Sequence, residues 1–279
     1  MHTNDIMEPS TLRKTAAPLQ QKRRLLNSYI TTGRFDEFVE QVFWMTENRE
    51  SSYVCFANVH MLVEAYQDPG FNKILNEADV ASPDGGPLSK LMKLKYGHSQ
   101  DRVPGMDLMP RLIEEAAARG KSVFFYGSTD DVLEEVVKTA KAKHPAIKIA
   151  GHYSPPFRKL TDAEDQSIVD MINDSGADLV FVALGCPKQE RWMAEHKGRV
   201  KACMLGVGQA YMTYAGLEKR LPKWARDLSL EWTYRLYQEP KRLWKRYLVT
   251  NSIFVYLTLK DALWPKDKHS KATAVTVGY

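Results

Sequence analysis

Between Phe35 and Val207 the hydrophobic residues alternate between two patterns. Short runs that are apolar on both faces predict β-strands covered by helices on both sides. Longer segments with apolar residues at helical spacing lie before and between these runs and predict α-helices. The predicted strands are Tyr53–Ala57, Asp79–Ser82, Ser122–Tyr126, Ile147–Ala150, Leu179–Leu184 and Ala202–Val207. The predicted helices are Phe35–Glu47, Val59–Gln67, Leu88–Lys95, Asp107–Arg119, Asp130–Lys143, Glu164–Ser175 and Lys188–His196.

Two of the predicted helices have start signals. Ser128–Asp131 is a polar run typical of a helix start, and Thr161–Glu164 has the capping-box pattern. Strands that alternate with helices predict an α/β fold with a Rossmann-like, doubly wound and mainly parallel sheet. Ligands of such sheets bind at the carboxyl ends of the strands, so residues there are the first candidates for a functional site.

The length of 279 residues fits one α/β domain with an appendage. We expect a flexible N-terminal segment (1–28), the α/β domain (29–220), a C-terminal helical appendage (221–265) and a disordered tail (266–279). The polar first 21 residues lack the apolar core of a signal peptide. Three scattered cysteines are typical of reduced cytosolic thiols. We therefore expect a cytoplasmic protein.

The appendage differs from the rest of the chain in charge. Between Arg220 and Lys260 nine basic residues face three acids, a net +6, so the remainder of the +5 chain carries −1. The apolar run Tyr247–Leu259 has 13 residues, fewer than the ~20 that span a bilayer. Cations beside tryptophans and an apolar run predict docking on an anionic membrane surface. The alternative is an amphipathic helix that packs on the core.

Glycines and polar residues follow five of the predicted strands. The glycines let the backbone approach a ligand, and the five turns together favour a nucleotide diphosphate site. In any single turn of this kind the glycine more often serves only the connection between strand and helix. The residues at these strand ends include Asn58, Asp84, Gly85, Gly127, Ser128, Gly185 and Gly208. Asp84 is the candidate general base, because Gly85 and Gly86 leave it open to a substrate. The alternative is that Asp84 caps the next helix.

Two further segments offer polar side chains. Lys188, Gln189 and Glu190 open a predicted helix. Gln189 is a candidate to bond a sugar or a base, whereas Lys188 and Glu190 fit a solvated first turn equally well. Arg102 stands before Pro104 and is a candidate phosphate ligand, with an ordinary surface arginine as the alternative.

The sequence favours neither a metal site nor a dinucleotide site. It contains no Asp-x-Asp pair to hold a divalent ion against a diphosphate, and its seven histidines have no ligand spacing. We therefore expect cationic side chains to neutralise the diphosphate. The run from Gly206 to Gly208 lacks the third glycine of a dinucleotide fingerprint, since Tyr211 occupies that place. We expect no cofactor.

These motifs together resemble the WecG/TagA/CpsF glycosyltransferase family over roughly Thr32 to Leu259. The run Pro187–Glu190 and the run that begins at Glu231-Trp232 and ends at Glu239-Pro240 are specific when they occur in this order. The other matching residues are Asn58, Pro83–Gly85, Arg102–Asp107, Ile172–Asp178, Gly185-Cys186 and Leu230–Leu236.

The resemblance implies a function and roles for residues. It implies an inverting, metal-free enzyme that moves a sugar from a UDP-sugar donor to a polyprenyl-diphosphate-linked acceptor at the inner face of the cell membrane. Asp84 would be the base, and Asn58, Arg102 and Gln189 would line the donor pocket. The arginines and lysine of the appendage would close over the diphosphate, and these are Arg235, Arg242, Lys245 and Arg246. The sequence leaves open whether the protein forms a homo-oligomer.

The chain departs from the family pattern at two places. Met212 stands where the family has an aspartate, and Phe56 stands where it often has threonine. Both changes bear on the donor sugar, so N-acetylmannosamine is not assumed.

Two other functions are compatible with parts of the sequence. The loss of the aspartate at Met212 fits a catalytically inactive sugar-nucleotide-binding or scaffold protein, against which the retained Asp84 argues. The basic, aromatic appendage has some likeness to single-strand nucleic-acid binders. The run Tyr247–Leu259 is too apolar for a solvent-exposed binding face, so we expect no nucleic-acid partner.

Overall fold

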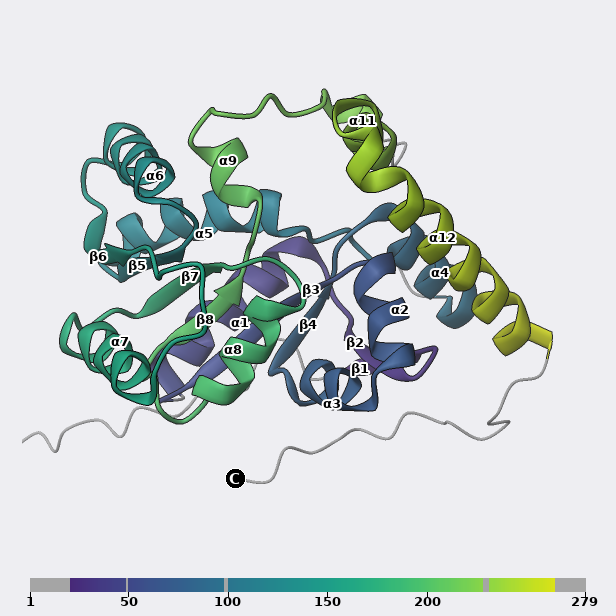
Figure 1. The fold of residues 1–279 in the computed structure, drawn as a ribbon, viewed down its shortest axis with the longest axis horizontal. Helices are drawn as coiled ribbons and strands as arrows, with labels where there is room; N and C mark the ends of the chain where they lie inside the picture. Colours follow the sequence, from purple (N-terminus) through teal and green to yellow (C-terminus); the bar gives the residue numbers. More distant parts are fainter. Residues whose placement is uncertain (1–20, 49, 98–99, 228–230, 264–279) are drawn as a thin grey trace, which may run out of the picture.

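The computed structural model describes residues 21–263, except residues 49, 98–99 and 228–230. Its centre is a six-stranded sheet in the order β4-β3-β8-β7-β5-β6, in which every neighbouring pair is parallel. The strands are β3 Ser52–Ala57, β4 Val80–Pro83, β5 Ser122–Gly127, β6 Lys148–Tyr153, β7 Leu179–Ala183 and β8 Cys203–Gly206. The predicted doubly wound α/β fold is confirmed (Figure 1).

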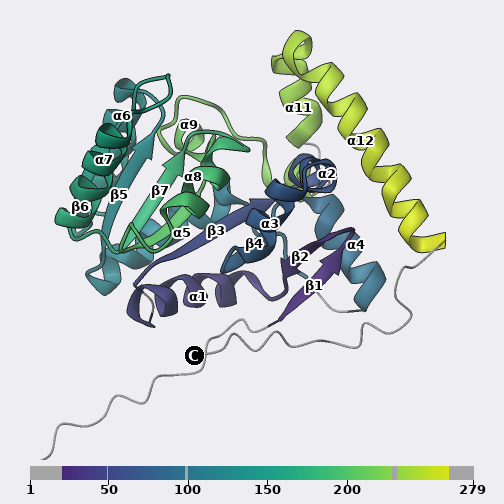
Figure 2. The ribbon, with the colours of Figure 1, turned by 60° about the horizontal axis from the view of Figure 1, so that its bottom comes forward.

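Helices cover both faces of the sheet, as Figure 2 shows. One face carries α1 Phe35–Asn48, α5 Gly105–Arg119, α6 Asp130–Lys143 and α9 Ala210–Tyr214. The other face carries α2 Val59–Gln67, α3 Pro69–Glu77, α4 Gly86–Tyr96, α7 Asp162–Asp174 and α8 Lys188–His196. Strand β3 shows why the strand runs are apolar throughout: Val54 and Phe56 pack in the first layer, Cys55 and Ala57 in the second, and all are buried.

A small hairpin precedes the sheet. Its strands, β1 Lys22–Leu25 and β2 Ser28–Thr31, are antiparallel. Leu25 and Ile30 are buried in the core, and the Thr31 hydroxyl accepts a hydrogen bond from the Ala81 N–H of β4 at 2.9 Å. The expectation of a flexible segment through residue 28 is therefore wrong for residues 22–28. Residues 1–20 of that segment and the tail 266–279 lie outside the described residues.

The C-terminal appendage is helical, with α10 Lys223–Asp227, α11 Glu231–Gln238 and α12 Pro240–Leu263. Helix α12 lies along α2 and α4 (Figure 1), where Phe254 and Leu257 are buried in the main core and Asp261 pairs with Lys95 at 2.5 Å. Other apolar side chains of α12 are exposed, namely Leu248, Val249, Val255, Tyr256, Leu259 and Leu263. One part of this helix is thus packed on the core, and the other part faces outward. None of the helices in the described ranges is long and apolar enough to cross a bilayer.

Candidate active site

The carboxyl ends of five neighbouring strands meet along one edge of the sheet. Residues Ala57 and Pro83 are paired across β3 and β4, Val182 and Gly206 across β7 and β8, and Gly127 and Ala183 across β5 and β7. The residues that follow these strand ends therefore lie along the same edge. They include most of the predicted site: Asn58, Asp84, Gly85, Gly127, Ser128, Gly185 and Gly208.

Asp84 stands at the end of β4, beside the end of β3. Its backbone N–H donates to the Ala57 carbonyl at 2.7 Å, which holds the turn against β3. The N-cap of α4 is Gly85, at φ +113°, and a glycine has no side chain with which to cap the helix. Asp84 stands one residue before this N-cap, and both the role of a base and the role of a cap from its side chain stay predictions. A side chain at residue 85 would be strained at this φ, which explains the glycine in the turn.

Asn58 follows the neighbouring strand, β3, and stands at the start of α2. Its side-chain oxygen accepts a hydrogen bond from the Met61 N–H at 3.1 Å, so Asn58 is the N-cap of α2. An N-cap of this kind typically stabilises a helix by about 1 kcal/mol. The cap uses the oxygen of the amide, and a ligand contact by its NH₂ group stays a prediction.

At the end of β5 the backbone packs closely against the backbone at the end of β7. A Cβ on Gly127 would lie 2.6 Å from the Ala183 carbonyl oxygen, so only glycine fits there. The N–H of Ser128 donates to the same carbonyl at 2.9 Å, and the Ser154 hydroxyl donates to the Ser128 carbonyl at 2.8 Å. Ser128 has φ +62°, a left-handed conformation that is uncommon for serine. A ligand contact by either residue stays a prediction.

The Gln189 amide joins the ends of β7 and β8. Its NH₂ group donates to the Gly206 carbonyl at 2.7 Å and to Glu190 at 2.8 Å, and its oxygen accepts from the Gly185 N–H at 3.2 Å. A Cβ on Gly208 would lie 3.3 Å from that oxygen. Because Gln189 is only 5% exposed, these bonds give it a structural role, and its predicted contact with a sugar or base stays untested.

Glu190 is fully buried, although its position in the first turn of α8 is typical of a solvated acid. Burial raises the pKa of this carboxyl to about 7, against the opposing effect of hydrogen bonds from Gln189, its own N–H and Cys186. The predicted contact of Glu190 with a ligand is corrected to a buried role, since the side chain has no exposed surface. Lys188, the first residue of α8, is exposed.

Arg102 lies beside the end of β4, because the N–H of Val103 donates to the Pro83 carbonyl at 2.9 Å. Its guanidinium pairs with Asp107 at 3.3 Å and is 16% exposed, so it is not an ordinary surface arginine. Two arginines from the start of the appendage reach the same carboxylate: Arg220 at 2.7 Å and Arg226 at 3.0 Å. We call these four residues the Asp107 cluster.

The residues Asp107, Arg220 and Arg226 were not predicted as parts of the site. The Asp107 carboxylate stands in the first turn of α5, where an acid is common for purely helical reasons. Its partner Arg226 is 119 residues away along the chain. No local pattern links the two positions, and only the basic character of the appendage hinted at an acidic partner.

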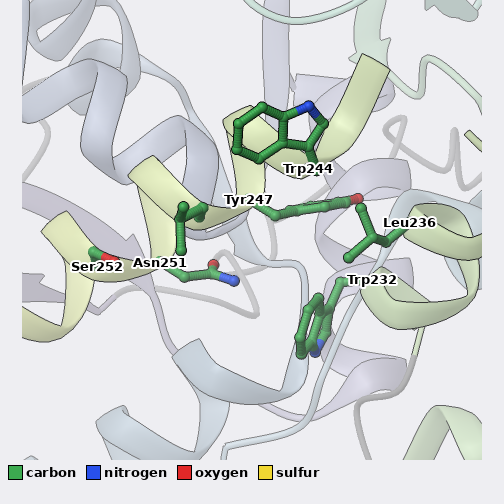
Figure 3. Close-up of a pocket in the computed structure, with 7 residues that line it drawn as sticks. Trp232, Leu236, Trp244, Tyr247, Asn251 and Ser252 are labelled. Atoms are coloured by element: carbon green, nitrogen blue, oxygen red, sulfur yellow. The ribbon is translucent and has the colours of Figure 1, made fainter. Parts of the chain in front are cut away.

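The predicted diphosphate ligands of the appendage fall on α11 and α12. Lys245 is exposed on α12. The side chains of Arg235, Arg242 and Arg246 lie outside the described residues. A groove of about 340 Å³ lies between the two helices (Figure 3), with walls and floor formed by Trp232, Leu236, Trp244, Tyr247, Leu248, Asn251 and Ser252. Trp232 and Tyr247 meet edge to face across it, with centroids 5.9 Å apart.

The described part of the chain holds no group of three His, Cys, Asp or Glu residues arranged to bind a metal ion. The described cations near the carboxyl edge include Arg102, Arg220 and Arg226.

The chain is similar to known proteins over most of its length. The family model described as "Glycosyl transferase WecG/TagA/CpsF family" matches residues 23–268. A Bacillus spizizenii protein named N-acetylglucosaminyldiphosphoundecaprenol N-acetyl-beta-D-mannosaminyltransferase is 34% identical over 82% of this chain and 83% of its own length. Proteins of the same name from Bacillus subtilis and Staphylococcus aureus are 31% and 28% identical, each over 80% of this chain and over 84% and 87% of their own lengths.

Proposed function

The chain belongs to the WecG/TagA/CpsF family of glycosyltransferases, and from this premise we propose its reaction. It transfers a hexose or N-acetylhexosamine-type sugar from a UDP-sugar to a polyprenyl-diphosphate-linked acceptor in bacterial cell-surface polysaccharide synthesis. The reaction is inverting and needs no metal ion. The observation that carries this proposal is the position of Asp84 beside Asn58 at the carboxyl edge, in a half-buried turn in which glycines follow the carboxylate.

Asp84 acts as the general base in the proposed reaction. Its carboxylate takes the proton from a hydroxyl group of the acceptor while the hydroxyl oxygen bonds to the anomeric carbon of the donor sugar. The bond between that carbon and the UDP oxygen breaks at the same time, and UDP leaves from the opposite side. A single displacement of this kind inverts the anomeric configuration and requires one base, which is what the carboxyl edge offers.

The leaving diphosphate is stabilised by cations and helix N-termini. Arg102 lies beside the base, and guanidinium groups pair with phosphate oxygens through two parallel hydrogen bonds. The N-terminus of α4 adds a partial positive charge at the same edge. Lys245 and the arginines at positions 235, 242 and 246 complete this set in the proposal. Such charges replace the divalent ion that other nucleotide-sugar enzymes use.

The donor sugar is set by residues near the end of β8. The relatives are named as N-acetylmannosaminyl transferases, and this supports an N-acetylhexosamine donor for the present chain. Met212 packs against the core where the family pattern has an aspartate, and Phe56 is buried beneath Gly105. We therefore leave the donor at the level of the sugar class.

The appendage is proposed to dock the enzyme on the inner face of the anionic cell membrane, where the acceptor lies. The exposed apolar residues of α12 and the aromatic groove between α11 and α12 (Figure 3) support this. Tryptophan and tyrosine favour the headgroup region of a bilayer, and Lys241 and Lys245 are exposed beside the groove. The groove has no acidic residue among its lining side chains.

The assignment of Asp84 is tested by the variant Asp84→Asn. Loss of a positioned base lowers turnover by on the order of 10²–10⁴-fold, while UDP binding stays near wild type. UDP release is measured with purified enzyme in the presence of EDTA, because the proposed reaction needs no metal ion. Asp174→Asn is the matched control, since Asp174 is exposed at the end of α7, where the chain enters β7.

Near-normal turnover by Asp84→Asn would contradict the role of this residue. Loss of wild-type activity in EDTA, with rescue by magnesium or manganese, would contradict the metal-free reaction. The second candidate function is an inactive nucleotide-sugar-binding protein of the same fold, favoured by Met212 in place of the family aspartate. That alternative predicts UDP binding without UDP release from any member of a donor panel.

A further inference from the structure

Gln209 and Glu218 form a side-chain pair at the end of β8. The Gln209 NH₂ group donates to both carboxylate oxygens of Glu218, at 2.7 Å and 2.9 Å. Gln209 follows Gly208 and is the N-cap residue of α9, whereas Glu218 lies in the segment that leads from α9 to the appendage. Both residues are half-buried, and Glu218 has no cationic partner among the described residues.

The pair lies at the same level of the carboxyl edge as the proposed base. Strand β3 lies between β8 and β4 in the sheet. The registers of β3 with these two neighbours, continued past the strand ends, place Gln209 and Asp84 level with Asn58, on opposite sides of it. The axes of β8 and β4 are two interstrand spacings apart, ~10 Å. One sugar ring with its hydroxyl groups can bridge this distance between the base and the pair.

The segment that carries Glu218 is fixed on both sides of this residue. On one side, the N–H groups of Leu217 and Glu218 donate to the Met212 carbonyl at 3.0 Å and 3.1 Å. On the other side, Arg220 pairs with Asp107 at 2.7 Å. The backbone at Glu218 is therefore held against α9 and α5, and its carboxylate has a defined position. Such a preorganised group suits recognition better than a mobile surface acid, because less conformational entropy is lost when a ligand binds.

The pair offers only hydrogen-bond acceptors to a ligand. A carboxylate only accepts hydrogen bonds, so the Gln209 NH₂ group faces Glu218 and is used there. The amide oxygen of Gln209 accepts no hydrogen bond from the described residues, and the Glu218 carboxylate keeps further lone pairs. Hydroxyl and amide N–H groups of a neutral sugar can donate to these oxygens. A carboxylate on the sugar has no proton to donate and is repelled by the like charge.

We propose that Gln209 and Glu218 select an uncharged donor sugar. Glu218 accepts hydrogen bonds from hydroxyl or N-acetyl N–H groups of the sugar and repels the carboxylate of a uronic acid, while Gln209 orients Glu218. The inference rests on the proposed function, in which residues near the end of β8 set the donor sugar. It gives the proposed sugar class a physical basis and excludes the corresponding uronic acids.

The test measures affinity by titration calorimetry on the full-length protein, with two donors that differ only at C6 of the sugar. UDP-glucose has a hydroxyl group there, and UDP-glucuronic acid has a carboxylate. The readout is the ratio of their dissociation constants, in which effects common to both donors cancel. Wild type is expected to bind UDP-glucose on the order of tenfold more tightly, because like charges in one site are unfavourable.

Glu218→Gln removes the charge and keeps the size of the side chain. The ratio is expected to fall on the order of tenfold, toward unity, through tighter binding of UDP-glucuronic acid. Glu218→Lys, with the opposite charge, is expected to favour UDP-glucuronic acid. Glu134→Gln, the same substitution at an exposed position of α6, is the control and should leave the ratio unchanged.

A purely structural pair would give a different result. If Glu218 only fastened the segment, Glu218→Gln would weaken both donors alike and keep the wild-type ratio, which would overturn the inference. If Glu218→Gln does not fold, as judged by circular dichroism, Gln209→Ala provides the comparison. Its ratio should fall, because the carboxylate is no longer held toward the donor, and an unchanged ratio would overturn the inference in that case.

UDP alone separates this inference from the proposed function. UDP has no sugar, so Glu218→Gln should bind it as wild type does, and a changed affinity would place Glu218 at the diphosphate and overturn its assignment to the sugar. Failure of wild type to bind UDP and both UDP-sugars would contradict the proposed function. Binding of UDP by wild type, with equal affinities for the two UDP-sugars, would overturn the selection alone.

Discussion

Glu190 has lost all contact with water, and one of its oxygens has no hydrogen-bond partner among the described atoms. The other oxygen accepts from the Gln189 amide, which in turn joins β7 to β8. Burial of a carboxylate favours the protonated form, which is why the pKa rises. Near neutral pH Glu190 therefore either keeps its proton or carries a negative charge inside the protein, and the buried charge is unfavourable.

The raised pKa predicts how stability changes with pH. The carboxyl titrates near 4.5 in the unfolded chain and near 7 in the folded protein, so the folded state binds more protons between these values. The contribution of Glu190 is full below about pH 4.5, falls as pH rises, and is lost by about pH 7. The difference amounts to roughly 3 kcal/mol by the conversion of pKa shifts to free energy.

Glu190→Gln is expected to remove this pH dependence while its amide oxygen still accepts from Gln189. Urea unfolding of the variant between pH 5 and 8 should show a smaller decline in the free energy of unfolding than wild type. Glu195→Gln, on the exposed side of the same helix, is the control and should decline as wild type does. Parallel curves for wild type and Glu190→Gln would contradict the assignment of a raised pKa.

At single residues the sequence predicted positions better than environments. The turn at Asp84 and the glycines at the strand ends follow from local pattern, because β–α turns place them regardless of the rest of the fold. The burial of Glu190 and Gln189 depends instead on contacts with β8, which no property of the first turn of α8 reveals. The solvated first turn, which was the alternative for Lys188 and Glu190, is therefore wrong for Glu190, whereas Lys188 is exposed.

At the scale of elements, the prediction succeeded where local signals agreed and failed where turn residues or charges obscured an element. Helix α2 has the bounds that were predicted, whereas α3 was missed. Asp68, Pro69 and Gly70 resemble a turn, yet Asp68 caps α3 through the N–H groups of Gly70 and Phe71, at 2.8 Å and 3.1 Å, with proline in the first turn. The hairpin of β1 and β2 was missed because Lys22, Arg23 and Arg24 make its first strand polar.

Helix α12 contains two leucines that test its two environments separately. Leu257 is 5% exposed in the core, and Leu259 is 58% exposed. Leu257→Ala is expected to lower the free energy of unfolding by about 2–5 kcal/mol, since it leaves a cavity against α2. Leu259→Ala, with the same change in size, should stay within about 0.5 kcal/mol of wild type. Equal losses for the two variants in thermal or urea unfolding would contradict the packing of α12 on the core.

The same packing changes how the appendage is best tested. Truncation after Glu239 would remove Phe254 and Leu257 from the core and expose α2, so loss of folding would be confounded with loss of membrane docking. Substitutions on the exposed side of the appendage avoid this difficulty, because they leave the buried side of α12 intact.

For the whole molecule, the docking proposal predicts that two exposed lysines hold the enzyme on anionic lipid. Lys241→Gln/Lys245→Gln removes two charges, each contributing roughly 1 kcal/mol near such a surface, so the partition coefficient should fall by about 30-fold. Sedimentation with phosphatidylglycerol-containing vesicles measures this. Lys138→Gln/Lys141→Gln, two exposed lysines of α6, is the matched control and should sediment as wild type does. Indistinguishable sedimentation of the two variants would rule out these lysines as the anchor.

At this scale the fold class was predictable, and so was the meeting of the strand ends at one edge of the sheet, since both follow from the order of elements. The Asp107 cluster was not, because it depends on where the appendage returns to the sheet. After α9 the chain passes the N-terminal end of α5, which brings Arg220 and Arg226 to Asp107, and no spacing in the sequence encodes that path.

The order of the strands also governs how the protein is made. β3 pairs with β8 at Tyr53 and Met204, so the centre of the sheet joins segments about 150 residues apart. A ribosome that adds 5–20 residues per second needs roughly 8 to 30 s between these two segments. Until β8 emerges, the edge of β3 that will pair with β8 is uncovered and can pair with other nascent chains. Helix α12 follows later still, so the surface that we propose to face lipid is synthesised only after every strand of the sheet.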